Sequence, residues 1–177
     1  MKLAGLDFET ANGKCGSICA AGCAILEDGV VTDSREWLIC PHEGYRWMRP
    51  DFTEIHGLTY RDVCHCPEFP DAWLEMRQML LCADCVVIHN APFDQGHLRS
   101  VLALYELPAV DFNYTDSVLI SRKLFPEMPS HRLDVMAERF GIQFHHHDAR
   151  EDAMACASIV ARTGIPAGCI RHFSTGA

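Results

Sequence analysis

Four carboxylates and one histidine, spread over the length of the chain, are the residues best suited to carry chemistry. Asp7 and Glu9 lie near the start, Asp94 lies mid-chain, and His147 and Asp152 lie near the end. Carboxylate oxygens are the ligands that hard divalent cations prefer, and a histidine titrates near neutral pH, which suits it to proton transfer. The set therefore predicts metal-assisted hydrolysis of a phosphodiester bond.

The spacing of the acids indicates how they could converge. Asp7 and Glu9 are two residues apart on a predicted strand, and the period of two places both carboxylates on one face. The alternative is two acids at a strand end that simply face water, which is common for Asp and Glu. Asp94 follows a short apolar run, where a lone Asp is otherwise a helix cap.

The last motif combines a base with an acid. His147 and Asp152 are five residues apart, and Asp148 between them is a predicted helix cap. This places the histidine on the incoming loop and Asp152 in the first or second turn of the helix. Of the three consecutive histidines, His145 to His147, only His147 stands at the right spacing from the Asp152 carboxylate. Both groups can face the sheet if the helix packs across it.

Composition limits the class of protein. The 177 residues are 49% hydrophobic and 22% charged, which predicts one globular domain over residues 1–177. The net charge of −9 argues against a protein that holds nucleic acid by a basic coat alone, so an acidic nuclease must gain positive charge from metal ions. The sequence contains no apolar run of signal-peptide or membrane-spanning length, and we expect a soluble, cytoplasmic protein without a membrane partner.

Ten cysteines raise the question of disulfides or zinc. Without an export signal we expect reduced thiols, most of them small core residues. Those in apolar or Ala-rich stretches are Cys15, Cys19, Cys23 and Cys156. The pairs Cys64/Cys66 and Cys82/Cys85 could hold zinc, but the second pair falls where a helix ends and a buried strand begins, which favours a structural role.

The first third of the chain predicts an antiparallel meander. Strands are expected over 2–9, 17–26 and 30–40, with Asp28-Gly29 as the tight turn between the last two. Residues 46–66 are punctuated by Pro and Gly and predict a loop with a short helix, a kind of connection that often serves a site.

The remainder alternates helices and strands. An amphipathic helix is expected over 68–82, and the apolar run 85–88 predicts a buried strand. Beyond this strand the chain is expected to be helical apart from a strand over 110–114. The later helices are expected to start at Asp116-Ser117, to span 131–140 with Ser130 as cap and Gly141 as end, and to run from Asp148 to Thr163 with Gly164 as end. The resulting order, β-β-β-α-β-α-β followed by helices only, predicts an α/β domain with a mixed sheet and helices on its faces.

The segments that carry the acids resemble a known family. LDFETAN, HNAPFD and HDAREDA are similar to the three motifs of the DEDDh 3′→5′ exonucleases, the DnaQ-like group that includes the proofreading subunit of bacterial DNA polymerase III and ribonuclease T. The motifs stand in the family's order and separation, and weaker similarity in SICAAGCAILEDG, IHGLT and FPEMPSHRLDVMAERFGI extends over nearly the whole chain. The resemblance implies a ribonuclease H-like fold.

The resemblance also implies a division of roles. Asp7, Glu9 and Asp152 would bind two divalent cations, Mg²⁺ or Mn²⁺, directly, and Asp94 would hold the second ion, in part through water. His147 would be the general base that takes a proton from the attacking water. The expected reaction removes nucleoside 5′-monophosphates from the 3′ end of single-stranded DNA or RNA.

Contacts to the substrate are less specified. The family resemblance makes Thr10 a candidate for contact with the terminal sugar and His56 a candidate near the base, although His56 could equally stabilise its loop. DNA and RNA remain open, including RNA 3′-end trimming, and some family members are homodimers.

Two hypotheses from other classes compete with the enzyme. One is a catalytically silent nucleic-acid or polymerase-binding module, against which the complete set of acids and histidine argues. The other is a zinc-stabilised interaction domain built on the cluster Cys64, His65, Cys66, Cys82 and Cys85.

Overall fold

The chain folds around a mixed β-sheet, and the computed structural model describes residues 1–176. In that range the sheet has six strands in the order β3-β2-β1-β4-β5-β6. The strands are β1 (Lys2–Thr10), β2 (Ile18–Glu27), β3 (Val30–Leu38), β4 (Cys85–Ile88), β5 (Asp111–Asp116) and β6 (Arg171–Ser174). β1, β4 and β5 are parallel, and the other pairings are antiparallel. Asp28 and Gly29 both have positive φ, 49° and 83°, which is the turn geometry that the predicted β2–β3 hairpin requires.

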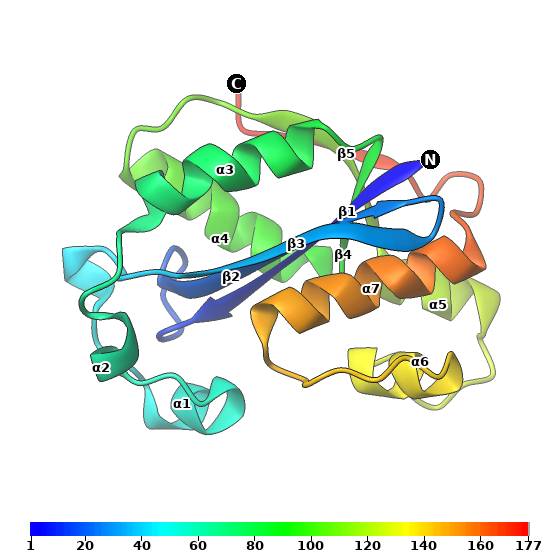
Figure 1. Ribbon diagram of the computed structural model, residues 1–177, viewed down its shortest axis with the longest axis horizontal. Coiled ribbons are helices and arrows are strands. Elements are labelled where there is room, and N and C mark those ends of the chain that lie inside the picture. Colours follow the sequence, from blue (N-terminus) through cyan, green and yellow to red (C-terminus); the bar gives the residue numbers. More distant parts are fainter. Residues whose placement is uncertain (177) are drawn as a thin grey trace.

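Helices cover both faces of the sheet, as the predicted fold class required. They are a 3₁₀ turn η1 (Glu43–Tyr45), α1 (Pro50–His56), α2 (Tyr60–Val63), α3 (Phe69–Leu81), α4 (Ala91–Leu104), α5 (Ser117–Leu124), α6 (Leu133–Arg139) and α7 (Ala149–Thr163). Figure 1 shows α3 above the strands and α6 and α7 below them, and the apolar side chains of α4 are buried in the same core as those of α3.

Alternation along β1 divides the core into two layers. Ala4, Leu6 and Phe8 are buried with the residues of α3 and α4, and Phe8 makes an edge contact with Phe69 at a ring distance of 6.4 Å. Leu3, on the opposite face, is buried with the residues of α5, α6 and α7. Phe8 therefore belongs to the core on the α3 face of the sheet, and Asp7 and Glu9 share the opposite, α7 face.

Two glycines let α7 lie directly against the strands. A Cβ at Gly22 of β2 would overlap the backbone of Ala149, and a Cβ at Gly5 of β1 would overlap the carbonyl of Ala153. Neither glycine has a positive φ, so space rather than backbone conformation requires Gly here. The close approach fixes the start of α7 over the end of β1.

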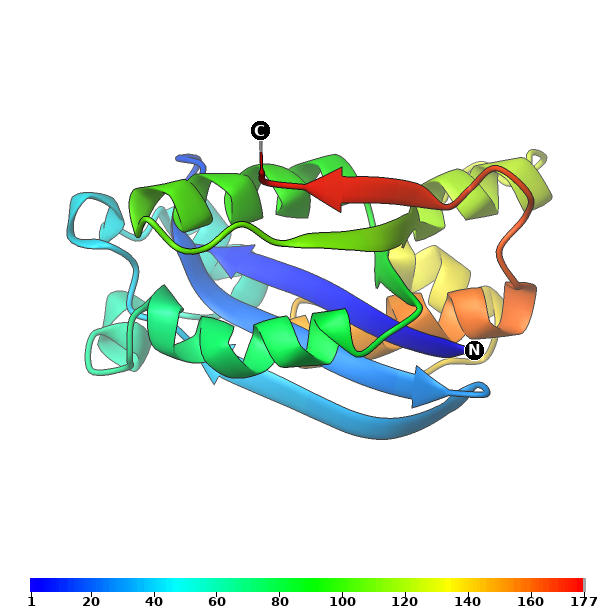
Figure 2. The same ribbon diagram turned by 90° about the horizontal axis from the view of Figure 1, so that it is seen from above.

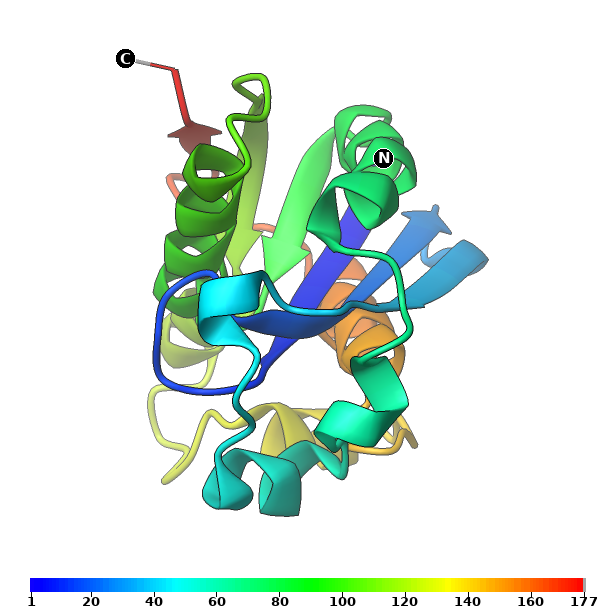
Figure 3. The ribbon, with the colours of Figure 1, turned by 90° about the vertical axis from the view of Figure 1, so that its left-hand side faces the viewer.

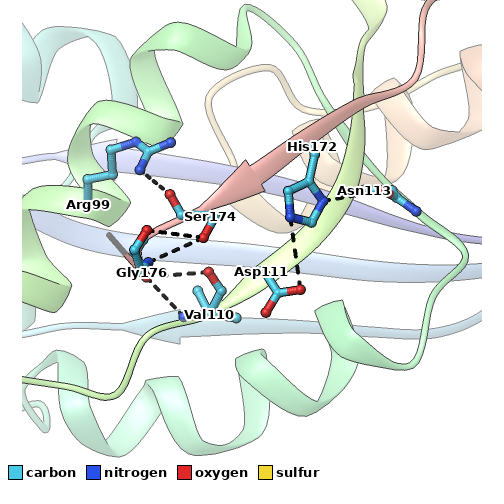
Figure 4. A network of polar contacts seen from close by, with 8 residues as sticks. Arg99, Val110, Asp111, Asn113, His172, Ser174 and Gly176 are labelled. Atoms are coloured by element: carbon cyan, nitrogen blue, oxygen red, sulfur yellow. Dashed lines mark hydrogen bonds and ion pairs between the residues drawn. The ribbon is translucent and has the colours of Figure 1, made fainter.

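The sixth strand was not predicted. Figure 2 shows β6 beside β5 at one edge of the sheet. Figure 4 shows the polar contacts that hold it: Arg99 of α4 donates to the Ser174 carbonyl, and the His172 ring lies 4.0 Å from the Asp111 carboxylate. The Arg99 guanidinium also stacks over the Phe173 ring at 4.3 Å. β6 has four residues with one buried side chain, too short a pattern for periodicity to reveal.

Several predicted details are corrected. Residues 46–66 contain two short helices, α1 and α2, where one short helix was expected. The helix expected from His131 begins at Leu133, because Ser130 accepts a bond from the Arg132 N–H (3.4 Å) outside the helix and no side chain caps α6. Cys15 is exposed on the loop after β1, whereas the other three cysteines assigned to the core are buried. Among residues 1–176, no helix combines the length and apolar character needed to cross a bilayer.

Candidate active site

The candidate site lies at the carboxyl end of the parallel strands. β1, β4 and β5 point the same way, so the segments that leave them meet at one edge of the sheet. Figure 3 looks onto this end, with α1 and α2 drawn below the end of β1. A pocket of about 360 Å³ opens there, and its lining includes four of the five predicted catalytic residues, Asp7, Glu9, His147 and Asp152.

Three of the acids converge. Ligand oxygens of Asp7, Glu9 and Asp152 lie within 4.8 Å of one another. One oxygen of Asp152 accepts the His147 N–H at 3.0 Å, while the other, Oδ1, is buried and has no hydrogen-bond partner among the described residues. Asp148 caps α7 through the Glu151 N–H (3.0 Å), and Asp152 lies in the first turn, the nearer of the two turns that the sequence allowed. An oxygen left without a partner in a cluster of acids is available to a cation.

The electrostatics of the cluster favour a cation strongly. Burial, reinforced by the neighbouring carboxylates, raises the pKa of Asp7 well above its usual range and the pKa of Glu9 to about 8. Burial, together with Asp148 and other acids nearby, also raises the pKa of Asp152 to about 7. Desolvated like charges resist ionisation, and a divalent ion would reverse this by supplying opposite charge. The donor set is all oxygen, which fits Mg²⁺ or Mn²⁺.

Asp94 occupies a different position in the cluster. It lies in the first turn of α4, its side chain is buried, and Oδ1 accepts the Phe8 N–H at 3.1 Å. Its charge acts on the pKa of both Asp7 and Glu9, but it is not among the three acids whose oxygens converge. Asp94 is therefore tied to the backbone between the two strand acids.

His147 is held in an unusual backbone conformation beside the acids. Its φ is +71°, a left-handed value uncommon for a residue with a Cβ, and the bond from its N–H to Asp152 fixes it there. Its Nδ1 lies 3.9 Å from Glu9 Oε1, and its ring stacks on His146 at 3.9 Å. Burial and the nearby His146 lower the pKa of His147 below the usual value, so the ring is neutral and able to accept a proton at pH 7.

The two predicted substrate contacts lie side by side in the pocket lining. His56 Nδ1 accepts the Leu58 N–H (3.1 Å), so the proton is on Nε2, which donates to the Thr10 carbonyl (3.2 Å). Both ring nitrogens of His56 thus stabilise the loop after α1, the alternative that its sequence left open. The faces of both residues still line the pocket.

Asp116 is a positioning residue that sequence reasoning assigned only to a helix start. Its carboxylate accepts the N–H groups of Asn90 (3.2 Å), Ala91 (3.1 Å) and Val118 (2.9 Å), which joins the end of β5 to the turn before α4. That turn passes through Asn90 at φ +66° and delivers Asp94. The sequence offered one signal for this role: Asp116 follows one predicted strand, and Asn90 follows the other buried strand, so the two chain turns were expected at the same edge of the sheet.

The zinc hypothesis gains no support. In the stretch from 1 to 176, the groups of side chains arranged to hold a metal contain His, Asp and Glu and no cysteine. Cys85 is buried within β4 while Cys82 is exposed at the end of α3, so the pair does not face a common site.

Comparisons with known proteins agree with this geometry. The family model described as Exonuclease matches residues 5–160. The PolC-type DNA polymerase III of Streptococcus pneumoniae is 31% identical over 110 residues, 61% of this chain and 7% of the polymerase. The same polymerase of Bacillus subtilis is 28% identical over 139 residues, 77% of this chain and 9% of the polymerase. The chain thus spans less than a tenth of the length of these relatives.

Solved structures show the same fold. Exonuclease X in complex with 5′ overhanging duplex DNA superposes with a TM-score of 0.74 at 22% identity, covering 91% of this chain and 90% of that one. The nuclease domain of 3′hExo, a DEDDh family member bound to rAMP, gives 0.75 at 16% identity, covering 97% and 96%. The six-stranded mixed sheet with helices on both faces confirms the predicted ribonuclease H-like fold. With the family model matched over most of its length, the chain belongs to the exonuclease family, in the DnaQ-like 3′→5′ group that its motifs predicted.

Proposed function

We propose that residues 1–177 act as a single exonuclease domain that hydrolyses the 3′-terminal phosphodiester bond of single-stranded DNA or RNA and releases nucleoside 5′-monophosphates. The observation that carries the proposal is the convergence of Asp7, Glu9 and Asp152 in an open pocket, with His147 against Glu9. Exonuclease X bound to DNA and 3′hExo bound to rAMP share the fold and support a nucleic-acid substrate.

The acids hold two divalent cations, Mg²⁺ or Mn²⁺. Asp7, Glu9 and Asp152 bind directly, and Asp94 serves the second ion, where its bond from the Phe8 N–H keeps one oxygen oriented. When bound, the ions lower the pKa of the attacking water and stabilise the charge that develops on the leaving 3′ oxygen. The high pKa values of the metal-free cluster support this assignment, since only added positive charge lets all of these acids ionise at pH 7.

His147 is the general base. A water molecule attacks the phosphorus atom, its proton passes to the neutral imidazole, and the bond to the 3′ oxygen of the preceding nucleotide breaks. The products are a nucleoside 5′-monophosphate and a strand one nucleotide shorter. The His147 side chain is 37% exposed, which leaves it accessible to water while the stacked His146 ring and the Asp152 bond keep it in place.

Thr10 and His56 line the proposed binding site of the terminal nucleotide. They share the pocket with Phe52, Ile55 and Phe93, of which Ile55 and Phe93 are exposed large apolar side chains. A base can stack on such a surface without regard to its identity. The nucleotide is thus held between apolar side chains on one side and the carboxylates on the other.

The proposal includes the compartment and the substrates. We place the protein in the cytoplasm, where it would act on single-stranded 3′ ends of DNA or, as the alternative, trim the 3′ ends of RNA. The polymerase relatives raise association with a replicative polymerase as a further partner, and a homodimer is the proposed assembly where one forms.

Product analysis tests the proposal. Oligonucleotides of DNA and RNA, labelled at either the 3′ or the 5′ end, are incubated with the protein in Mg²⁺ or Mn²⁺. A 3′ label released as a 5′-monophosphate, together with a 5′-labelled ladder that shortens one nucleotide at a time, is the expected result. Internal cleavage products, or full activity in a chelator, would contradict the assignment.

Two variants separate the base from the general effect of removing a histidine. His147→Ala should abolish most turnover and leave Mn²⁺ binding largely intact, because His147 is not proposed as a ligand. His145→Ala is the matched control: its ring is 91% exposed, and His145 does not line the pocket, so turnover should persist. Unchanged turnover in His147→Ala would remove its role. Tightly bound stoichiometric zinc without hydrolysis would favour the interaction-domain alternative.

A further inference from the structure

A second hollow adjoins the catalytic pocket on the side away from α1. It has a volume of about 420 Å³, and its polar lining comprises His89, Asn90, Arg122, Ser130, His131 and Arg132. His89 and Arg132 line both hollows, so the two are neighbours. Its walls come from the turn after β4, from α5 and from the segment that leads into α6.

The charge of this hollow differs from that of the rest of the surface. No carboxylate lines it, although the chain carries a net charge of −9. Arg122 is exposed on α5 and makes no ion pair or hydrogen bond with any residue between 1 and 176, whereas Arg46 and Arg49 are paired with Glu68 and Asp51. Because no carboxylate pairs with Arg122, its positive charge is available to an anionic ligand.

Other polar groups in the hollow are similarly available. Arg132 uses Nε and one terminal nitrogen on Asp134, at 3.1 Å each, which leaves the other terminal nitrogen free of that pair. His131 Nδ1 is buried and has no partner among the described residues. Asn90 is exposed, and its backbone is fixed by the bond to Asp116. The hollow therefore brings together hydrogen-bond donors and positive charge without a lining carboxylate, which is the chemistry of an anion site.

The position of the hollow fits one part of the substrate. Figure 1 shows α1 and α6 on opposite sides of the loop that leads into α7. The pocket is lined at one side by Phe52, Ile55 and His56 of α1, where the terminal nucleotide is proposed, and at the other by His89, Arg132 and Leu133. A strand whose scissile phosphate lies at the carboxylates must leave on the second side.

We propose, building on the proposed function, that this hollow binds the backbone phosphates immediately upstream of the terminal nucleotide, with Arg122 as the principal contact and Arg132 at the border with the catalytic pocket. The hollow makes the enzyme prefer a polynucleotide to a nucleotide ester. Phosphates occur in DNA and RNA alike, so the contact serves both.

The test compares substrates that do and do not reach the hollow. A p-nitrophenyl ester of a nucleoside 5′-monophosphate ends at the terminal nucleotide, whereas an eight-nucleotide DNA or RNA strand extends beyond it. For Arg122→Ala the ratio of kcat/KM for the strand to kcat/KM for the ester should fall about 5-fold or more, the loss expected of one charge-assisted contact at an accessible site. The slope of log KM against log salt should decrease in magnitude by about 0.7, the value for one phosphate contact on a single strand.

Arg35→Ala is the control with the same change in total charge. Arg35 lines a separate hollow with Glu75 on β3 and α3 that shares no residue with the catalytic pocket, so neither the ratio nor the salt slope should change. Arg122→Glu should lower the ratio further than Arg122→Ala does. A ratio and a slope equal to those of the unmodified protein in both Arg122 variants would overturn the proposal, and equal losses in Arg35→Ala would reduce it to a general charge effect.

Binding provides a readout that does not depend on turnover. Fluorescence anisotropy with a 5′-labelled strand in Ca²⁺ should show a dissociation constant about 5-fold higher for Arg122→Ala, for DNA and RNA alike. If the unmodified protein bound strands through Arg122 but hydrolysed neither substrate, the proposed function would fail and the phosphate site would stand. If it hydrolysed both but Arg122→Ala bound strands normally, the reverse would hold.

Discussion

The catalytic cluster and the β5–β6 edge treat polar side chains in opposite ways. Asp94 and Asp152 are buried among other acids, and one Asp152 oxygen has no partner in residues 1–176. At the edge, His172 and Asp111 are exposed and face one another, and Arg99 is bonded to the backbone of β6 (Figure 4). The polar groups at the edge find their partners within the fold. The acids of the cluster lack compensating positive charge and need a ligand to supply it, so the stability of the fold alone does not explain them.

The largest effect should follow from removing a cluster acid. Asp7→Asn keeps the shape of the side chain but removes a charge from the three convergent oxygens. Several kcal/mol of charge stabilisation depend on the bound ions, so turnover should fall by about a thousandfold or more. Mn²⁺ affinity, measured by calorimetry, should fall with it.

A control at the β5–β6 edge tests whether the effect is specific to the cluster. Asp111→Asn, at the sheet edge, is the matched control, because its carboxylate is exposed and lies far along β5 from the cluster. It should retain both turnover and Mn²⁺ affinity. Normal metal binding in Asp7→Asn would mean that the cluster is not the cation site.

The next effect concerns how the cluster is assembled. Gly22→Ala would place a methyl group into the backbone of Ala149, at the start of the helix that carries Asp152. The helix must shift away from β2, and we expect a loss of roughly 2–3 kcal/mol in the free energy of unfolding, typical of forced overpacking in a core. Turnover should fall as well, since a displacement of about 1 Å at a catalytic group can cost about a hundredfold.

Gly96→Ala provides the opposite expectation. Gly96 lies within α4, and the nearest atom to an added Cβ is Cys15 Sγ at 4.0 Å, an ordinary contact. Alanine in place of a helical glycine should stabilise the protein by up to about 1 kcal/mol. Denaturant unfolding of both variants, followed by circular dichroism, checks the two signs. Equal stability of Gly22→Ala and the unmodified protein would show that α7 tolerates a different distance from the sheet.

These residues also show which features the sequence could reveal. The alternation along β1 predicted that Asp7 and Glu9 share a face, because a strand's period of two is a local property. The cap at Asp148 predicted the start of α7 for the same reason. The requirement for Gly22 could not be predicted, since it arises from contact between segments far apart in the chain. The left-handed backbone of His147 is likewise imposed by a bond to Asp152, not by its own residue type.

A smaller effect links the cluster to stability. Burial and neighbouring acids raise the pKa of Glu9 from an ordinary 4.5 to about 8, so the folded, metal-free protein binds an extra proton between those pH values. The free energy of unfolding must therefore decrease as the pH rises from about 4.5 to about 8. Glu9→Gln removes this contribution and should stabilise the metal-free protein above pH 8 by roughly 1–2 kcal/mol, a rise in Tm of about 2–8 °C, while it abolishes turnover.

Thermal unfolding between pH 5 and pH 9, in a chelator and in Mg²⁺, measures this effect. The Tm difference between Glu9→Gln and the unmodified protein should increase with pH in chelator. Mg²⁺ should narrow it, because the ion binds the ionised acids of the unmodified protein. A pH-independent difference in chelator would mean that Glu9 is not strained by its neighbours.

The smallest effect is expected at the sheet edge. His172→Ala removes a ring that is 58% exposed and lies 4.0 Å from Asp111, itself 73% exposed. Such a surface pair contributes at most about 1 kcal/mol and often nothing measurable, so the free energy of unfolding should change by less than about 0.5 kcal/mol. Arg99→Ala should cost more, because it removes both the bond to the Ser174 carbonyl and the cover over Phe173, a fully buried ring. If His172→Ala proved as damaging as Arg99→Ala, the edge would depend on an ion pair rather than on packing, and its contrast with the cluster would lose its basis.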